Sequence, residues 1–244
     1  MESSILLFLL VCLGSLISSL TGLGGGSVIL AGLMLVYPPE IAIPLHSFTQ
    51  LTANVLRAGI SFKKINWKVV AAYGSLMLPM AWLGAMIFDY INPSWLKILV
   101  GIVILISIIP MKFRSTEIPR TSIFVVIGAL SGFLGIFVGS VGPMVLPFFN
   151  RLKLKRDAMI ATKSAGQMIL QVTKIIAFSG AAGIDFGTLS SQIGLLMTGS
   201  LVGVLVSIPL GRKIPDDKFN KIITVLLAVI SVKVLWEGIT ELVH

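Results

Sequence analysis

Residues 21–30 read TGLGGGSVIL, with four glycines inside an otherwise apolar stretch. A related stretch, GSVGPMVLP, occupies residues 139–147. Glycine destabilises a helix by about 1 kcal/mol relative to alanine, so both stretches predict a break in the helix that contains them. Each break lies in a segment, 4–36 or 121–149, that is too long for one straight pass through a bilayer and short for two.

The composition of the chain is that of a polytopic membrane protein. Of its 244 residues, 56% are hydrophobic and 12% are charged, and the mean hydropathy is +1.00. Apolar runs recur from end to end, and a soluble domain could not hide so much apolar surface. The expected fold class is therefore all-α. Single helical passes are predicted at about 41–62, 69–89, 94–111, 157–179, 187–211 and 219–239.

The first apolar segment and the cysteine content narrow the class further. The segment at 3–20 lacks the basic start and small-residue cleavage site of a signal peptide, so we interpret it as a retained membrane segment. Cys12 is the single cysteine. It excludes an intrachain disulfide and the paired thiols that a membrane thiol–disulfide carrier needs.

Basic residues predict how the chain crosses the membrane. Four connections, 63–68, 112–120, 151–156 and 212–221, hold 14 of the 19 Lys and Arg residues. Basic residues collect on cytoplasmic loops, which explains the net charge of +9 without a nucleic-acid partner. With all four connections in the cytoplasm, 121–149 enters and leaves on the cytoplasmic side, and by analogy 4–36 enters and leaves outside.

The predicted architecture is two inverted-topology repeats, 1–112 and 120–244. Each consists of a glycine-broken re-entrant hairpin and three transmembrane helices, and both termini are extracytoplasmic. The alternative is eight ordinary helices in two parallel halves, which would place the basic 151–156 connection outside. Paired discontinuous helices in inverted repeats are typical of secondary transporters, whose substrate binds near the midplane.

The two halves also match in sequence. HSFTQLTANVLR (46–57) aligns with KSAGQMILQVTK (163–174) at an offset of 117, which pairs serine with serine and glutamine with glutamine. GGSVILA (25–31) matches VGPMVLP (141–147) at an offset of 116. SWLKILVGIVILIS (94–107) resembles KFNKIITVLLAVIS (218–231) in the same order. These three matches indicate an internal duplication.

The polar groups inside the predicted membrane segments favour an anion. No Asp or Glu falls at the centre of a predicted crossing, as a cation carrier would require, and freed N–H groups at a helix N-terminus attract anions. The candidate substrate-binding residues are Gly24, Gly25, Gly26, Ser27, His46, Ser47, Gln50, Asn54, Ser140, Gly142, Lys163, Ser164, Gln167 and Gln171. Lys163 and His46 would attract the anion, and His46 is also a candidate for proton exchange.

Each of these features has a second interpretation. The glycines could serve close helix packing, and the amides could join helices by hydrogen bonds. Arg57 and Lys174 either face the pathway or extend along the helix to the membrane surface. The sequence by itself leaves both interpretations open.

The paired motifs resemble those of the TauE/SafE family of sulfite and organosulfonate exporters. The residues are TGLGGGSVILAGLML (21–35) with AIPLHSFTQLTANVL (42–56), and VGSVGPMVLPFF (138–149) with AMIATKSAGQMILQVT (158–173). The resemblance covers essentially the whole chain. It implies transport of sulfite, thiosulfate or an organosulfonate across the bacterial inner membrane. Ala31 stands where the family usually has proline, and His46 and Lys163 replace the threonine of a Thr-Ser pair.

The leading interpretation is a secondary carrier that works by alternating access. The alternatives are an anion channel, a carrier for another small organic anion, and a membrane hydrolase. A hydrolase is disfavoured because no GxSxG motif occurs and no membrane carboxylate accompanies His46. No cofactor, metal or nucleotide is expected. The expected partners are a small anion and the lipid bilayer, while the direction of transport, the coupling ion and the assembly into a homo-oligomer stay open.

Overall fold

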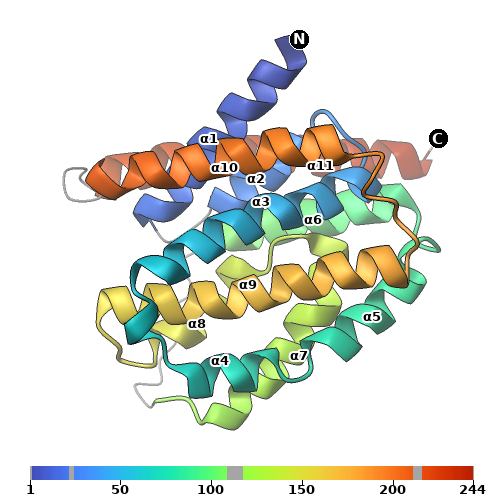
Figure 1. The fold of residues 1–244 in the computed structure, drawn as a ribbon. Helices are drawn as coiled ribbons and strands as arrows, with labels where there is room; N and C mark the ends of the chain where they lie inside the picture. The colour runs from blue at the N-terminus through green and yellow to red at the C-terminus, as the bar shows by residue number, and fades with distance from the viewer. Residues whose placement is uncertain (1, 22–24, 109–117, 211–215, 244) are drawn as a thin grey trace.

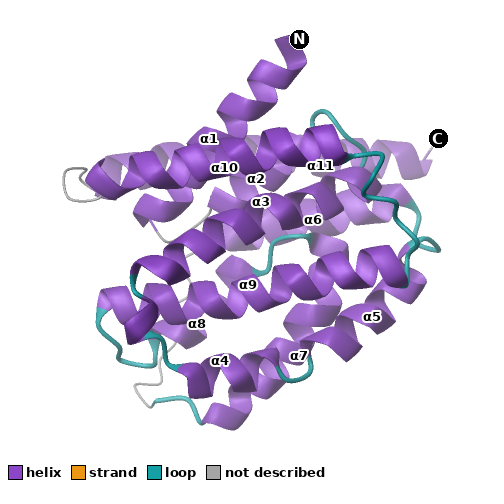
Figure 2. Ribbon diagram, in the orientation of Figure 1, coloured by secondary structure: helices purple, strands orange, loops and turns teal. Residues whose placement is uncertain are grey.

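The computed structural model describes residues 2–21, 25–108, 118–210 and 216–243. Within these ranges the chain is helical, with no strand (Figures 1 and 2). The helices are α1 (Glu2–Thr21), α2 (Gly25–Leu33), α3 (Pro39–Ile60), α4 (Trp67–Gly74), α5 (Met77–Phe88), α6 (Pro93–Ile108), α7 (Thr121–Val138), α8 (Gly142–Asn150), α9 (Arg156–Gly180), α10 (Ser190–Leu210) and α11 (Asp216–Val243), with a short 3₁₀ turn, η1 (Phe62–Lys64).

Both predicted helix breaks are confirmed. α1 ends at Thr21 and α2 begins at Gly25, while α7 ends at Val138 and α8 begins at Gly142. Gly139 follows α7 with a φ of +68°, a left-handed conformation that favours glycine. Pro143 lies in the first turn of α8, where its missing N–H costs no helical hydrogen bond. α2 and α8 contain nine residues each, about half a membrane pass.

A third break, between α4 and α5, was not predicted. The apolar run predicts one pass over 69–89, but α4 ends at Gly74 and α5 starts at Met77. Pro79 explains the interruption, because it has no N–H to donate to Ser75 and its ring would clash with that carbonyl in a continuous helix. At this break, the hydroxyl of Ser75 donates to the carbonyl oxygen of Ala72 at 2.8 Å.

The helices pack in pairs that join the two halves of the chain. α1 packs along α10, α5 along α7, α3 along α9, and α6 along α11. α3 and α9 cross the middle of the molecule side by side (Figure 1). Lys64 Nζ contacts Asp157 Oδ2 at 2.8 Å, and the N–H of Asn66 donates to Thr162 Oγ1 at 3.0 Å. These contacts fix the C-terminal end of α3 beside the N-terminal end of α9.

Glycines allow two of these pairs to approach closely. A Cβ on Gly128 of α7 would overlap the carbonyl oxygen of Tyr73, and one on Gly132 would lie 2.5 Å from that of Met77. In the other pair, a Cβ on Gly203 of α10 would overlap the carbonyl oxygen of Cys12 in α1. Small residues four apart are the usual means of close packing between membrane helices.

The exposed surface and the helix lengths confirm a multi-pass membrane protein. Three segments of the described chain are long and apolar enough to cross a bilayer: Trp67–Phe88, α7 and α10. The apolar stretches Ser4–Ser19 and Pro93–Ile106 are shorter. Many large apolar side chains on α1, α5, α7 and α10 are exposed, as lipid-facing positions require.

Candidate functional site

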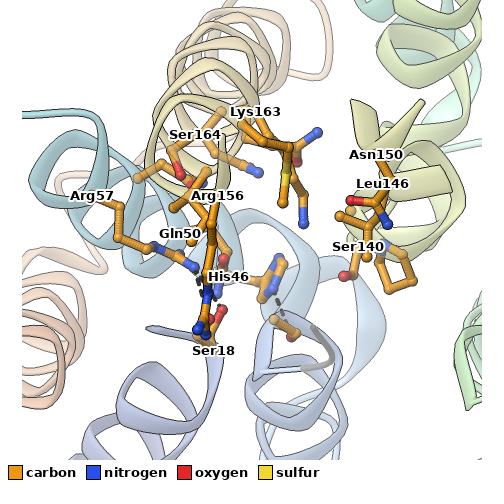
Figure 3. A pocket seen from close by; sticks show the side chains of 18 residues that line it. Ser18, His46, Gln50, Arg57, Ser140, Leu146, Asn150, Arg156, Lys163 and Ser164 are labelled. Atoms are coloured by element: carbon orange, nitrogen blue, oxygen red, sulfur yellow. Dashed lines mark hydrogen bonds between the residues drawn. The ribbon is translucent and has the colours of Figure 1, made fainter. Parts of the chain in front are cut away.

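A cavity of about 160 Å³ lies between α3, α8 and α9 (Figure 3). An apolar cavity of about 150 Å³ holds a benzene-sized molecule, so this one has room for a small organic or inorganic ion. Its lining residues are Ser18, Gly26, His46, Gln50, Asn54, Arg57, Ser140, Gly142, Pro143, Leu146, Asn150, Arg156, Met159, Ile160, Lys163, Ser164, Gln167 and Gln171.

The cavity carries positive charge. Arg57, Arg156 and Lys163 line it, together with His46, and the described lining includes no carboxylate. Side-chain amides and hydroxyls supply most of the other polar groups. A concave site lined by charge of one sign concentrates ions of the opposite sign, so the lining favours an anion over a cation.

The cavity opens at one end of the groove between α3 and α9. Asn150 and Arg156 are exposed at that end, whereas His46, Gln50 and Gln167 are 1%, 7% and 6% exposed in the middle of the molecule. The open end is where α8 leads into α9 and where α3 leads into η1. The basic connections 63–68 and 151–156 therefore flank the mouth of the cavity.

Ten of the fourteen candidate residues come together in this cavity: Gly26, His46, Gln50, Asn54, Ser140, Gly142, Lys163, Ser164, Gln167 and Gln171. Gly25, Ser27 and Ser47 are buried beside it without lining it. Ser47 Oγ donates to the carbonyl oxygen of Ile43 within α3, at 3.3 Å. Gly24 lies outside the described residues.

The breaks before α2 and α8 meet beside the cavity. Ser27 Oγ lies 3.4 Å from Ser140 Oγ, which joins the two breaks. A Cβ added to Gly26 would lie 3.3 Å from Gln50 Oε1 and from Ser140 Oγ. At Gly142 the nearest atom to such a Cβ would be Gln167 Oε1, at 4.0 Å. The N-terminal ends of both short helices thus face the cavity, where their dipoles favour an anion.

Two buried side chains bring polar atoms to this point without a described partner for each atom. The Nε2 of His46 lies 2.9 Å from the carbonyl oxygen of Gly26, so Nε2 carries the proton and donates. His46 Nδ1 and Gln50 Nε2 are buried and make no hydrogen bond to the described residues. Buried polar atoms are usually paired, so these two indicate that a polar ligand or water belongs beside them.

Arg57 and Lys174 contact the C-terminal ends of α1 and α7, the helices that precede the two breaks. Arg57 Nη1 donates to Ser18 Oγ at 2.8 Å and to the carbonyl oxygen of Ser18 at 3.4 Å, near the end of α1. Lys174 Nζ donates to the carbonyl oxygen of Gly139, directly after α7, at 2.9 Å. A cation is favourable at a helix C-terminus. Lys174 is 0% exposed, so it does not extend to the membrane surface, and only Arg57 also lines the cavity.

Sequence reasoning missed several lining residues. Arg156 was counted only as part of the basic 151–156 connection, Asn150 lies between that connection and the 121–149 segment, and Ser18 lies in a segment that was interpreted through its apolar pattern. The duplication was the signal that could have found Asn150 and Arg156. Asn150 lies after the aligned segment of α8, and Arg156 lies before the aligned segment of α9.

The fold and the cavity together are those of a helical membrane protein with a basic cavity between two broken helices. A family model described as Sulfite exporter TauE/SafE matches residues 7–234, and the chain belongs to this family of transporters. No curated protein and no solved structure matches the chain significantly.

Proposed function

We propose that this chain is a secondary transporter for a small sulfur-containing anion, which binds in the cavity between α3, α8 and α9. The observation that carries the proposal is the lining: three cationic side chains, several amides and no described carboxylate, at the N-terminal ends of two short helices. Sulfite, thiosulfate and organosulfonates fit this chemistry, because their oxygens accept hydrogen bonds from Lys, Arg and backbone N–H groups. The family is consistent with this substrate class.

The helix pairing supports an inverted repeat. Such a repeat pairs the helices of the two halves in chain order. The equivalent elements are α1 and α7, α2 and α8, α3 and α9, α4–α5 and α10, and α6 and α11. The packing of α1 on α10 then corresponds to that of α7 on α5, while α3 with α9 and α6 with α11 pair across the pseudo-symmetry axis. Contacts of α2 with α3 likewise correspond to those of α8 with α9.

The difference between the two halves supports alternating access. Positions that line the cavity in the second half have buried equivalents in the first half, at the offsets of the sequence match. The pairs are Asn150 with Met34, Met159 with Ala42, and Ile160 with Ile43. We infer from these pairs that one half-pathway is open in this conformation and that its counterpart is closed. By the distribution of basic connections, the open half faces the cytoplasm.

Aromatic side chains support closure of the opposite end. Phe88 at the end of α5 packs against Phe178 of α9 at a centroid distance of 5.2 Å and against Phe137 of α7 at 6.4 Å. All three rings are buried. We infer that this cluster separates the site from the extracytoplasmic side, and that it must move apart when the cytoplasmic mouth closes.

Flux in proteoliposomes tests the proposal. Vesicles that contain the full chain would be loaded separately with sulfite, thiosulfate, sulfoacetate or chloride, and uptake or release would be followed against concentration. We expect saturable flux of at least one sulfur anion, strongly reduced by Lys163→Met. Lys233→Met is the matched control, because Lys233 is an exposed cation on α11, outside the cavity.

Three other results would argue against the proposal. Absence of sulfur-anion flux in vesicles that contain folded protein would rule out this substrate class. Non-saturating flux with unitary currents would identify a channel. Unchanged kinetics in Lys163→Met would remove that lysine from the mechanism.

A further inference from the structure

We propose that Gln167 determines specificity: it presents a carbonyl oxygen to the cavity and selects sulfur anions that also carry an O–H or N–H group. This inference rests on the proposed function of the cavity as the substrate site. The amide of a glutamine can offer either donors or an acceptor. Its orientation here is fixed by a chain of hydrogen bonds behind it.

The chain of hydrogen bonds has one allowed direction. Ser131 Oγ lies 2.7 Å from the carbonyl oxygen of Ile127, which can only accept, so the Ser131 hydroxyl donates there. Tyr73 must therefore donate its proton to Ser131 Oγ, at 3.0 Å. The phenol oxygen is left to accept, and the group 2.9 Å away must be the NH₂ of Gln167. The carbonyl Oε1 of Gln167 is consequently directed away from Tyr73.

The surroundings keep this arrangement rigid. Tyr73, Ser131 and Gln167 are 0%, 3% and 6% exposed, and the ring of Tyr73 packs edge-on against Phe149 at 5.5 Å. The ring also packs against Gly166, where a Cβ would lie 2.6 Å from Tyr73 Cδ1. Gln167 lines the cavity, and its Oε1 faces the position of a Cβ on Gly142. An acceptor is thus fixed beside the start of α8.

A fixed acceptor discriminates among anions of equal charge. Lys163 and Arg57 suit any anionic headgroup, but the oxygen of a fully ionised group placed against Gln167 Oε1 would meet a second acceptor without a proton between them. A ligand with a hydroxyl or amino group supplies that proton. Sites built to hydrogen-bond a ligand's O–H reject analogues that lack it much more strongly than apolar pockets reject an extra methylene.

The test compares two ligands of similar size and equal charge at one pH. Hydroxyethanesulfonate and propanesulfonate would be titrated into the full chain in lipid nanodiscs, and binding would be measured by calorimetry. We expect hydroxyethanesulfonate to bind about tenfold more tightly, because a buried acceptor without a donor is costly. The same ratio should appear in competition against a transported sulfur anion.

Two variants connect the preference to Gln167. Tyr73→Phe removes the acceptor that holds the NH₂ group, so the amide can rotate and offer a donor to the cavity. Gln167→Met removes the amide and keeps a side chain of similar length. In both variants we expect the ratio of the two affinities to fall from about tenfold to about twofold or less, and this ratio is the readout whatever happens to the affinity for propanesulfonate itself.

The outcomes separate this inference from the proposed function. Equal binding of the two sulfonates by the unmodified chain would overturn the selective role of Gln167 and leave the anion site standing. A preference that persists in both variants would also overturn it. If no sulfur anion binds or is transported, the proposed function fails, and the inference fails with it.

Discussion

Gly25 and Gly26 are adjacent in sequence but face different environments. A Cβ on Gly25 would overlap Ser18 and the carbonyl oxygen of Gly14, whereas a Cβ on Gly26 would point toward Gln50 and Ser140 in the cavity. The first glycine lets α2 approach α1, and the second leaves room for a ligand. The packing interpretation therefore applies to Gly25, while the position of Gly26 is compatible with the proposed role in the site.

This contrast predicts different defects for two alanine substitutions. Gly25→Ala should destabilise the protein by about 1–3 kcal/mol, because overpacking forces backbone to move, and thermal unfolding in detergent would measure the change. Gly26→Ala should unfold near the temperature of the unmodified protein but lose substrate affinity. Equal unfolding temperatures for the two variants would contradict the assignment.

Gly142 allows a milder perturbation of the same site. Gly142→Ala adds a methyl group whose nearest described atom is 4.0 Å away, so the fold should tolerate it. The methyl group occupies cavity space at the first residue of α8, and we expect the KM of anion flux to rise severalfold. Gly194→Ala is the matched control, because a Cβ there meets nothing within 4 Å and lies on α10, away from the cavity. A KM equal to that of the control variant would show that α8 does not contact the substrate.

At the scale of the elements, two of the helix pairs depend on a few small residues. Gly128 and Gly132 place α7 against the backbone of α4 and α5, and Gly203 places α10 against α1. Lipid supplies no hydrophobic force between helices, so close van der Waals contact must stabilise these pairs. The cations at the ends of α1 and α7 add hydrogen bonds that fix where each helix stops.

Substitution of Gly128 in α7 should loosen the packing of α7 against α4. Gly128→Ala would force its methyl group into the carbonyl oxygen of Tyr73, so α7 must shift from α4. We expect a loss of about 1–3 kcal/mol in stability, measured by thermal unfolding in detergent. Gly59→Ala, where a Cβ meets no atom within 4 Å, should leave stability unchanged or slightly raised. A Gly128→Ala protein as stable as this control would contradict the close packing.

At the scale of the whole molecule, the proposed mechanism interprets the conformation as one open and one closed half-pathway. Asn150 is exposed at the mouth of the cavity, and its counterpart Met34 is 7% exposed. Exchange of these two environments is what alternating access requires of an inverted repeat. Under the proposed mechanism, the observed conformation would be one of the two states that the cycle needs.

Thiol labelling tests this asymmetry. In a Cys12→Ser background, Asn150→Cys should react with a membrane-impermeant maleimide applied from the cytoplasmic side, and Met34→Cys should react slowly from either side. A transported anion should change the two rates in opposite directions if the states exchange. Rapid labelling of Met34→Cys without substrate would show that the second half-pathway is already open.

The sequence by itself determined the membrane class, the positions of the two glycine breaks and most of the polar residues that meet in the cavity. These follow from local rules, because glycine runs interrupt helices and polar residues repeated on one helix face share one environment. The tertiary structure decided which glycine packs and which faces the cavity, and it brought Arg156 into the lining. It also placed Tyr73 behind Gln167 and Ser18 beside Arg57. Such pairs lie far apart in the chain, and their contact depends on how each helix is rotated and how closely it packs, which no local pattern specifies.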